Sequence, residues 1–219
     1  MNFVSRITLG DVLAHRVQSL RGKDAVIVCL QESSLLTCLT MARRLRAWVY
    51  PLIYEPVYTP DAAHRLLGAY DQDGDFCPNP GSPTSEAEPE TDAHEISEKQ
   101  RTKALKSVRD RVAAYGMELN KHQLDGRHAI LAADVLTSPL PIVVAQRFLA
   151  DVSPRSLTAV VGNATAQAAQ LVRLSAAQTE ILDVLSGIAF DDNHYFEQPD
   201  AYSVAEKHTL TQHIATYWQ

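Results

Sequence analysis

Two short polar segments directly follow apolar runs of the chain, at positions where a ligand could bind. The first carries amide, carboxylate and hydroxyl side chains: Gln31, Glu32, Ser33 and Ser34. The second carries one carboxylate and two hydroxyls: Asp134, Thr137 and Ser138. Serine at the start of a helix caps its first N–H groups, and the same N–H groups can bind an anion instead. These two segments are therefore the places where the chain is expected to do chemistry.

The apolar runs before these segments are expected to be buried strands. Short continuous apolar runs fit strands that are covered on both faces, and residues 25–30 form such a run. Strands are also expected at 48–54, 129–133, 157–161 and 179–185. Helical periodicity alternates with them, near 8–20, 34–46, 96–115, 142–149, 165–174 and 203–217. This alternation predicts an α/β fold with a mostly parallel central sheet and helices on both faces. Ligands in such sheets bind beyond the carboxyl ends of the strands, here the turns after Leu30 and Ala133.

Capping residues are expected at two helix starts. Thr8 or Asp11 is predicted to cap the first helix, because both have side-chain oxygens that accept from free N–H groups. Ser138 and Pro139 have the residue types of an N-cap and a first helical position. The second polar segment is therefore predicted to lead directly into a helix.

Three acidic residues at alternate positions lie in a predicted hairpin, 66–76, that turns at Asp73-Gly74. Calcium ligands have the same spacing as this set: Asp71, Asp73 and Asp75. An EF-hand loop needs Gly at its sixth position and Glu at its twelfth, where this chain has Phe76 and Ser82. A solvated hairpin turn is therefore favoured over a calcium site.

The other candidate metal ligands also favour structural roles. The chain has three cysteines, an odd number whose spacing fits no zinc pattern: Cys29, Cys38 and Cys77. Cys29 and Cys38 lie in apolar runs, so burial is expected. Residues 191–194, Asp-Asp-Asn-His, fit an Asx-rich turn better than a metal site.

Length and charge restrict the class of protein. The 219 residues suit one large α/β domain, and the composition is that of an ordinary globular protein, with 46% hydrophobic residues. The formal net charge of −6 argues against nonspecific binding of nucleic acid and of anionic membranes. The first residues lack the pattern of a signal peptide, and no apolar run has the length of a membrane span. A cytoplasmic protein is expected.

A change in composition separates the two halves of the chain. Residues 78–94 are rich in proline and acids and have almost no apolar side chains, which predicts a mobile loop. The helix expected after it carries a basic cluster: Lys99, Arg101, Lys103, Lys106, Arg109 and Arg111. A solvated face that balances the acidic loop is favoured, and the alternative is a helix that faces an anion beside the site.

The two polar segments and their flanking elements resemble the ligand loops of the type I phosphoribosyltransferase family. The family's strand, pyrophosphate loop and helix are similar to residues 28–45, Val-Cys-Leu-Gln-Glu-Ser-Ser followed by Leu-Leu-Thr-Cys-Leu-Thr-Met-Ala-Arg-Arg-Leu. Its ribose-phosphate motif is similar to residues 125–138, Asp-Gly-Arg-His-Ala-Ile-Leu-Ala-Ala-Asp-Val-Leu-Thr-Ser. The resemblance extends over roughly 6–206 and is closest to a bacterial group of uncharacterised phosphoribosyltransferase-like domains. It implies one Rossmann-like domain over 1–219.

The ribose-phosphate motif of this chain departs from the family pattern. In the family, two carboxylates bind the ribose hydroxyls, often with Mg²⁺, and here Ala133 replaces the first while Asp134 remains. The family's Thr/Ser-Gly turn then binds the 5-phosphate. Thr137 and Ser138 are kept, but Pro139 and a second proline two residues later remove two N–H donors. The resemblance therefore implies a weakened site for the sugar phosphate.

The pyrophosphate loop departs as well. The family commonly has a cation and Gly-Gly where this chain has Glu32, Ser33 and Ser34. A carboxylate about 4 Å from a diphosphate costs about 4 kcal/mol per charge pair at an effective dielectric of 20, before screening. Repulsion of diphosphate by Glu32 is therefore expected.

These departures favour a phosphoribosyltransferase-like protein that is catalytically degenerate and has a binding, regulatory or assembly role. The first alternative is a divergent active enzyme, which would use Mg²⁺ and phosphoribosyl diphosphate. The second is a binding protein for another phosphorylated or nucleotide-like ligand. The resemblance also implies a homodimer, since many members of the family are dimers.

Overall fold

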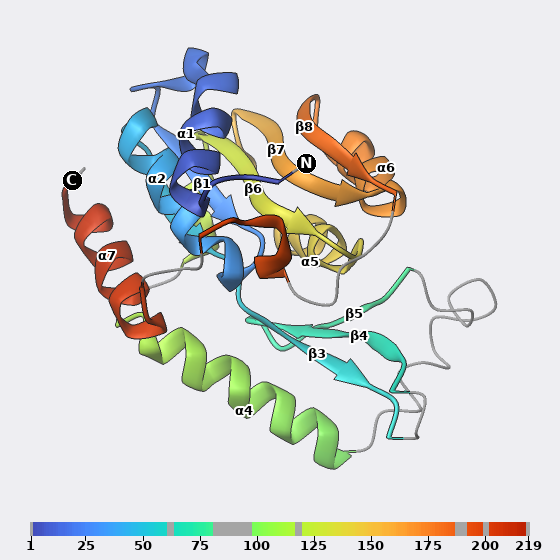
Figure 1. Cartoon of the computed structure of the whole chain (residues 1–219). Helices are drawn as coiled ribbons and strands as arrows, with labels where there is room; N and C mark the ends of the chain where they lie inside the picture. Colours follow the sequence, from blue (N-terminus) through green and yellow to red (C-terminus); the bar gives the residue numbers. More distant parts are fainter. Residues whose placement is uncertain are drawn as a thin grey trace.

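The computed structural model describes residues 2–60, 64–80, 98–116, 120–186, 192–198 and 202–217. Its centre is a five-stranded, wholly parallel sheet in the order β2-β1-β6-β7-β8 (Figure 1). In that order the strands are Trp48–Pro51, Ala25–Cys29, His128–Leu136, Ser156–Thr165 and Gln178–Leu185. The predicted α/β class with a mostly parallel central sheet is confirmed. The three strands expected to be buried neighbours, 25–30, 129–133 and 157–161, are adjacent as β1, β6 and β7.

Helices cover both faces of the sheet. One face packs against α1 (Arg6–Arg16) and α2 (Leu35–Leu45), and the other packs against α5 (Leu140–Phe148) and α6 (Ala166–Ser175). Alternate residues of each strand enter the two cores, so Ile27 faces the first core and Val28 the second. This two-sided burial explains why the strands read as continuous apolar runs. The last helix, α7 (Val204–Tyr217), contacts α2 and β2.

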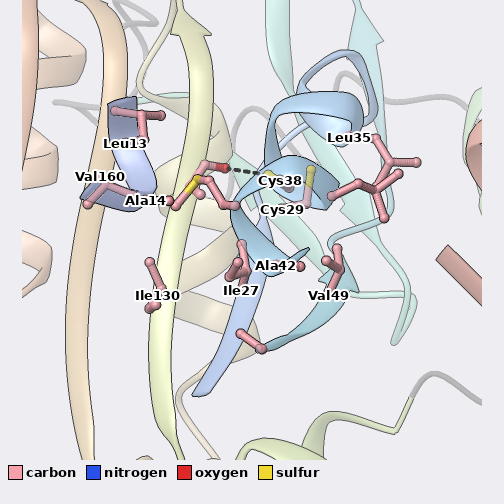
Figure 2. Close-up of a cluster of buried hydrophobic side chains, with 14 of the residues drawn as sticks. Leu13, Ala14, Ile27, Cys29, Leu35, Cys38, Ala42, Val49, Ile130 and Val160 are labelled. Atoms are coloured by element: carbon pink, nitrogen blue, oxygen red, sulfur yellow. Dashed lines mark hydrogen bonds between the residues drawn. The ribbon is translucent and has the colours of Figure 1, made fainter. Parts of the chain in front are cut away.

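The core on the α1 and α2 face contains two of the three cysteines, as Figure 2 shows. Cys29 of β1 and Cys38 of α2 are both buried, and the Cys38 thiol points to the carbonyl oxygen of Ala132 at 3.8 Å. Burial is the largest cause that raises the pKa of Cys38. The expected burial of Cys29 and Cys38 is confirmed, and Cys77 is buried as well, in the other core.

The first helix begins earlier than predicted. The predicted caps Thr8 and Asp11 are wrong, because Ser5 is the N-cap and its hydroxyl accepts from the Thr8 N–H at 3.1 Å. The helix ends at Arg16, and a separate 3₁₀ turn follows at Gln18–Leu20. The start at Arg6 brings this side chain to the edge of the sheet where the polar segments lie.

A second, antiparallel sheet lies beside the first and consists of β3 (Tyr54–Tyr58), β4 (Leu66–Asp71) and β5 (Phe76–Pro78). The strand expected at 48–54 is therefore two strands in two sheets. β2 stops at Pro51 on the edge of the parallel sheet, where an edge position tolerates the missing N–H of proline. The long helix α4 (Glu98–Ala114) packs against β3 and β4.

The hairpin predicted about Asp73-Gly74 is present between β4 and β5. Gly74 has φ +89°, which glycine adopts without strain. The Asp71 carboxylate accepts from the N–H groups of Asp73 at 3.1 Å and Asp75 at 2.9 Å, so this acid organises the turn. Of the loop predicted at 78–94, residues 81–94 lie outside the described residues. Within the described residues, no helix has the length and apolar character to span a bilayer.

Candidate functional site

The two polar segments meet at the carboxyl edge of the parallel sheet. Among the five parallel strands taken in chain order, the spatial order is 2-1-3-4-5, and it reverses between β1 and β6. In sheets of this order the ligand crevice lies at such a reversal. Ser34, at the end of the first segment, donates to Asp134 Oδ1 at 2.5 Å, and the Asp134 N–H donates to Ser34 Oγ at 3.0 Å. The structure therefore joins the two segments that the sequence singled out.

Asp134 lies inside a strand, not in a turn. β6 continues to Leu136, so the turn expected after Ala133 comes three residues later. The Asp134 side chain is fully buried. Its Oδ2 accepts from Arg6 Nε at 2.7 Å, and its Oδ1 accepts from the Val135 N–H at 2.7 Å as well as from the serine. Both carboxylate oxygens are therefore already bound within the protein.

Arg6 is the partner that sequence reasoning missed. Its residue is 4% exposed, and besides Asp134 it donates to Asn193 Oδ1 at 2.9 Å and lies 4.4 Å from the ring centre of Phe196. Asn193 belongs to the run considered as an Asx-rich turn or a metal site; residues 192–195 form a 3₁₀ turn. The sequence contains one signal for this role. A cation in the first turn of a helix is unfavourable for the helix dipole, so its presence there suggests a specific partner.

The residues that were matched to a ribose-phosphate motif present no free carboxylate to Mg²⁺ or a sugar. Ala133, where the family has its first carboxylate, is fully buried and packs in the apolar core on the α5 and α6 face. Asp134 has no free carboxylate oxygen facing solvent. In the described part of the chain, no three His, Cys, Asp or Glu residues cluster as metal ligands would. A ribose or a magnesium ion could reach Asp134 only if the pair with Arg6 opened.

The start of α5 is closed to anions by its own hydrogen bonds. The Leu140 N–H donates to Ser138 Oγ at 3.3 Å. The N–H groups of Ile142 and Val143 both donate to the carbonyl of Pro139, at 3.0 and 3.3 Å. The remaining residue of this turn is Pro141, which has no N–H. Within residues 140–143, no backbone donor is therefore left for a phosphate.

Side-chain packing closes the same turn. Thr137 and Ser138 are half-buried, whereas Pro139 and Leu140 are buried. The helix begins at Leu140 with Pro139 as N-cap, one residue later than the predicted pair of Ser138 and Pro139. The serine keeps a capping role, since its hydroxyl still accepts an N–H of the first turn. The start of this helix is therefore formed by buried apolar residues.

The start of α2 is different, because its charged residue is paired but lies beside a cavity. Gln31 is extended and its carbonyl accepts from the Cys29 thiol at 3.0 Å, and Glu32–Ser34 forms a 3₁₀ turn before the helix. The Glu32 carboxylate forms an ion pair with Arg111 and accepts from the Tyr115 hydroxyl at 3.1 Å. The repulsion of diphosphate expected above applies to an unpaired Glu32. Because Arg111 compensates the charge of this carboxylate, the repulsion is expected to be weaker.

Arg111 is the member of the basic cluster that reaches the site. It also donates to Glu55 Oε2 at 3.0 Å and to the Tyr54 carbonyl at 2.9 Å, so it ties α4 to both the first segment and β3. The other members are exposed to solvent: Lys99, Arg101, Lys103, Lys106 and Arg109. These five fit the solvated-face interpretation, whereas Arg111 pairs with two carboxylates of the protein itself.

A cavity of about 340 Å³ opens beside this ion pair. It is lined by residues of the first segment, α2, α4 and α7, and of the turn after α4: Glu32, Ser33, Leu35, Arg111, Tyr115, Lys207 and His208. The rings of Tyr115 and His208 lie 4.1 Å apart, and His208 Nε2 is 3.8 Å from Glu32 Oε1. Burial raises the pKa of Tyr115, and the nearby Glu32 carboxylate raises it further, so the phenol remains a donor. Sequence reasoning missed Tyr115 and His208, which carry no motif.

No protein-family model and no curated protein sequence matches the chain. Among solved structures, TT1426 from Thermus thermophilus matches with a TM-score of 0.73 and 17% identity, over 97% of this chain and 99% of that one. Hypoxanthine phosphoribosyltransferases match more loosely. The Staphylococcus aureus enzyme has a TM-score of 0.43 and 10% identity over 84% of this chain and 77% of its own. The hypoxanthine-guanine enzyme of L. donovani has a TM-score of 0.41 and 13% identity over 82% of this chain and 79% of its own.

The Thermus protein therefore has the same fold as this chain over nearly the full length of both. At 17% identity this likeness concerns the fold alone. The shared architecture is an α/β fold with a mostly parallel central sheet and helices on both faces.

Proposed function

We propose that this chain is a phosphoribosyltransferase-like protein that does not transfer phosphoribosyl groups and acts instead by binding a ligand or by assembly. The observation that carries the proposal is the state of Asp134. Of the two positions at which the family has sugar-binding carboxylates, only this one keeps an acid, and it is fully buried in a pair with Arg6. A residue that holds the sugar in a transferase has to present its carboxylate to the ligand.

The energetics of that pair support the proposal. If Asp134 turned toward a sugar, Arg6 would remain buried without its carboxylate, and breaking a buried pair in this way costs about 3–5 kcal/mol. The closed start of α5 removes a second contact, since its first turn has no N–H group left for the 5-phosphate. Both losses affect the sugar-phosphate half of the substrate, which a transferase must hold during the reaction.

An assay of pyrophosphate release tests this proposal. The chain is incubated with phosphoribosyl diphosphate, Mg²⁺ and each common nucleobase, beside an active hypoxanthine phosphoribosyltransferase as positive control. The expected result is no release above the protein-free background. Steady release by this chain that disappears in Thr137→Ala, a substitution at a half-buried position, would instead support the divergent enzyme.

A second function, binding of an anionic small molecule at the start of α2, is favoured by the cavity there. Its lining includes three basic side chains and one carboxylate, that of Glu32. The basic side chains are Arg111, Lys207 and His208. A phosphorylated or nucleotide-like ligand could pair with Lys207 and His208 and pack on the apolar wall. Thermal shift with ATP, GTP and inorganic phosphate tests this, with Lys207→Ala as the variant. Stabilisation by a ligand that Lys207→Ala abolishes is expected, and equal shifts in both proteins would contradict it.

A further inference from the structure

A basic surface lies at the amino edge of the parallel sheet, opposite the edge that carries Asp134. The turn at residues 21–24 leads into β1 and the end of α2 leads into β2, so both lie at this edge. The Gly22 N–H donates to the Leu45 carbonyl at 2.9 Å, which joins the turn to the end of the helix. Five exposed basic residues flank this contact along the chain and form the amino-edge basic surface: Arg21, Lys23, Arg43, Arg44 and Arg46.

The acids near this surface leave most of its positive charge uncompensated. Asp11 of α1 pairs with Arg44, and Asp24 pairs with Arg127 of a neighbouring loop. In the described part of the chain, none of the other four residues of the surface forms a salt bridge. Positive charge is therefore concentrated here in a chain whose formal net charge is −6.

The pair of Arg44 and Asp11 shows how this surface holds a carboxylate. Arg44 Nε and Nη2 donate to the two carboxylate oxygens at 2.6 and 2.9 Å, in the two-bond geometry that arginine forms with carboxylates. The hydrogen bond from Arg44 lowers the pKa of Asp11, and the charges of Arg44 and Arg43 also act to lower it. A pocket of about 270 Å³ between α1 and α2, which pack against each other (Figure 1), is lined by this pair and by Arg21. A second arginine therefore borders the position at which a carboxylate is already bound.

The helix end alone does not account for these cations. Arg43 and Arg44 lie in the last turn of α2, where a cation is favourable for the helix dipole. Arg46 is the C-cap residue and has φ 56° and ψ 51°, a left-handed conformation that glycine adopts without strain and arginine does not. The backbone at this position does not require an arginine, so the charged side chain needs a further reason.

We propose that the amino-edge basic surface is a docking site for an acidic segment of a partner protein. Side-chain carboxylates of that segment pair with Arg21, Arg43 and Arg46 as Asp11 pairs with Arg44. The ends of two packed helices and one turn span roughly 20 Å, which an extended segment of about six residues covers. A long nucleic acid fits less well, because it would extend beyond this surface over a molecule of negative net charge. The proposal does not depend on the state of Asp134, which lies at the opposite edge of the sheet.

The first test uses fluorescence anisotropy with a labelled peptide of about six consecutive glutamates. The wild type is expected to show saturable binding that weakens as salt is added, because exposed charges are screened beyond about 10 Å at 0.1 M salt. Arg43→Glu combined with Arg46→Glu should raise the dissociation constant roughly tenfold or more. The matched control is Lys103→Glu combined with Lys106→Glu on α4, which reverses two exposed cations and changes the net charge equally. Its dissociation constant is expected to stay within about threefold of wild type.

Three outcomes of this titration would overturn the proposal. The first is the absence of saturable peptide binding by the wild type, and the second is an equal loss of affinity in the two double variants. The third is tighter binding of a single-stranded RNA oligonucleotide of the same charge, titrated in parallel, which would assign the surface to nucleic acid.

The second test uses single changes that leave the helix end intact. Arg46→Gly removes one charge and places a suitable residue at the left-handed position, so Tm should not fall while the peptide dissociation constant rises about threefold. Asp11→Ala removes the carboxylate that occupies Arg44, so it should lower the peptide dissociation constant about threefold. Unchanged peptide affinity in either variant, with Tm measured on the same samples, would contradict carboxylate binding at this surface.

Discussion

The two helix starts at the carboxyl edge of the sheet differ in how their polar groups are used. At the start of α5 the N–H groups donate to Ser138 and to the carbonyl of Pro139, and apolar side chains fill the turn. At the start of α2 the polar side chain of Glu32 also has partners, but it lies beside a cavity of about 340 Å³. The first start is closed by its own groups, and the second, called the open start below, borders this cavity.

This difference shows that two departures from a family pattern can have different consequences. The prolines after Ser138 and the acid at position 32 both change the residue types that the resemblance leads one to expect. The prolines change the backbone and close their turn, whereas the charge of Glu32 is compensated by Arg111. We therefore expect substitutions near the closed start to affect folding, and substitutions near the open start to have smaller effects.

The largest effect is expected for Asp134→Ala. The substitution leaves Arg6 buried without its carboxylate and should lower the free energy of unfolding by about 3–5 kcal/mol. For a chain of this length that corresponds to a fall in Tm of roughly 10 °C, measurable by differential scanning calorimetry.

The control for this change is Asp11→Ala. Asp11 also pairs with an arginine, Arg44, but these side chains are 35% and 56% exposed, so a loss below about 1 kcal/mol is expected. Equal losses in the two variants would show that burial does not make the Asp134–Arg6 pair the stronger of the two contacts.

An intermediate effect is expected for Arg111→Ala. It removes the contacts of α4 with Glu32, Glu55 and the Tyr54 carbonyl, and since these groups are partly exposed the loss should be about 1–2 kcal/mol in urea unfolding. Arg101→Ala on the same helix is the matched control, because Arg101 is 53% exposed and faces a Glu98 that is 89% exposed. A change within about 0.5 kcal/mol is expected there. If both variants lose the same stability, Arg111 has no special role at the open start.

The smallest effect is expected for Tyr115→Phe, about 1 kcal/mol at neutral pH from the lost hydrogen bond to Glu32. The folded protein raises the pKa of Tyr115 above its ordinary 10.0, so above pH 10 the unfolded chain loses a proton that the folded chain keeps. Stability then falls as pH rises, by up to roughly 1 kcal/mol per pH unit from this group. Guanidinium unfolding at pH 9 to 11 should show a shallower decline for Tyr115→Phe than for wild type. Parallel pH profiles would contradict this role of Tyr115.

The sequence predicts the elements that depend on local pattern and fails where a partner is distant in the chain. The continuous apolar runs identify β1, β6 and β7, and Asp73-Gly74 identifies the hairpin, because each signal is contained in a few residues. The split of the strand expected at 48–54 depends on how the chain leaves the parallel sheet after Pro51, which no periodicity encodes.

The sequence predicts where the candidate site lies, but not whether its charged side chains are buried or paired. The turns after two parallel strands indicate Ser34 and Asp134, and the structure brings them together. The burial of Asp134 depends on Arg6, which is 128 residues away, and the pairing of Glu32 depends on Arg111, 79 residues away. Such pairs form through tertiary packing, so a count of charges along the chain treats each of these residues as unpaired.

Isothermal titration of the chain with phosphoribosyl diphosphate in the presence of Mg²⁺ tests the central claim most directly, which is that the sugar-phosphate half of the carboxyl edge is closed. We expect no binding with a micromolar dissociation constant, and we expect the heat up to the millimolar range to be the same for the wild type and for Asp134→Asn. Binding with a micromolar dissociation constant by the wild type, lost in Asp134→Asn while the variant remains folded, would contradict it and show that Asp134 leaves Arg6 to hold the ligand.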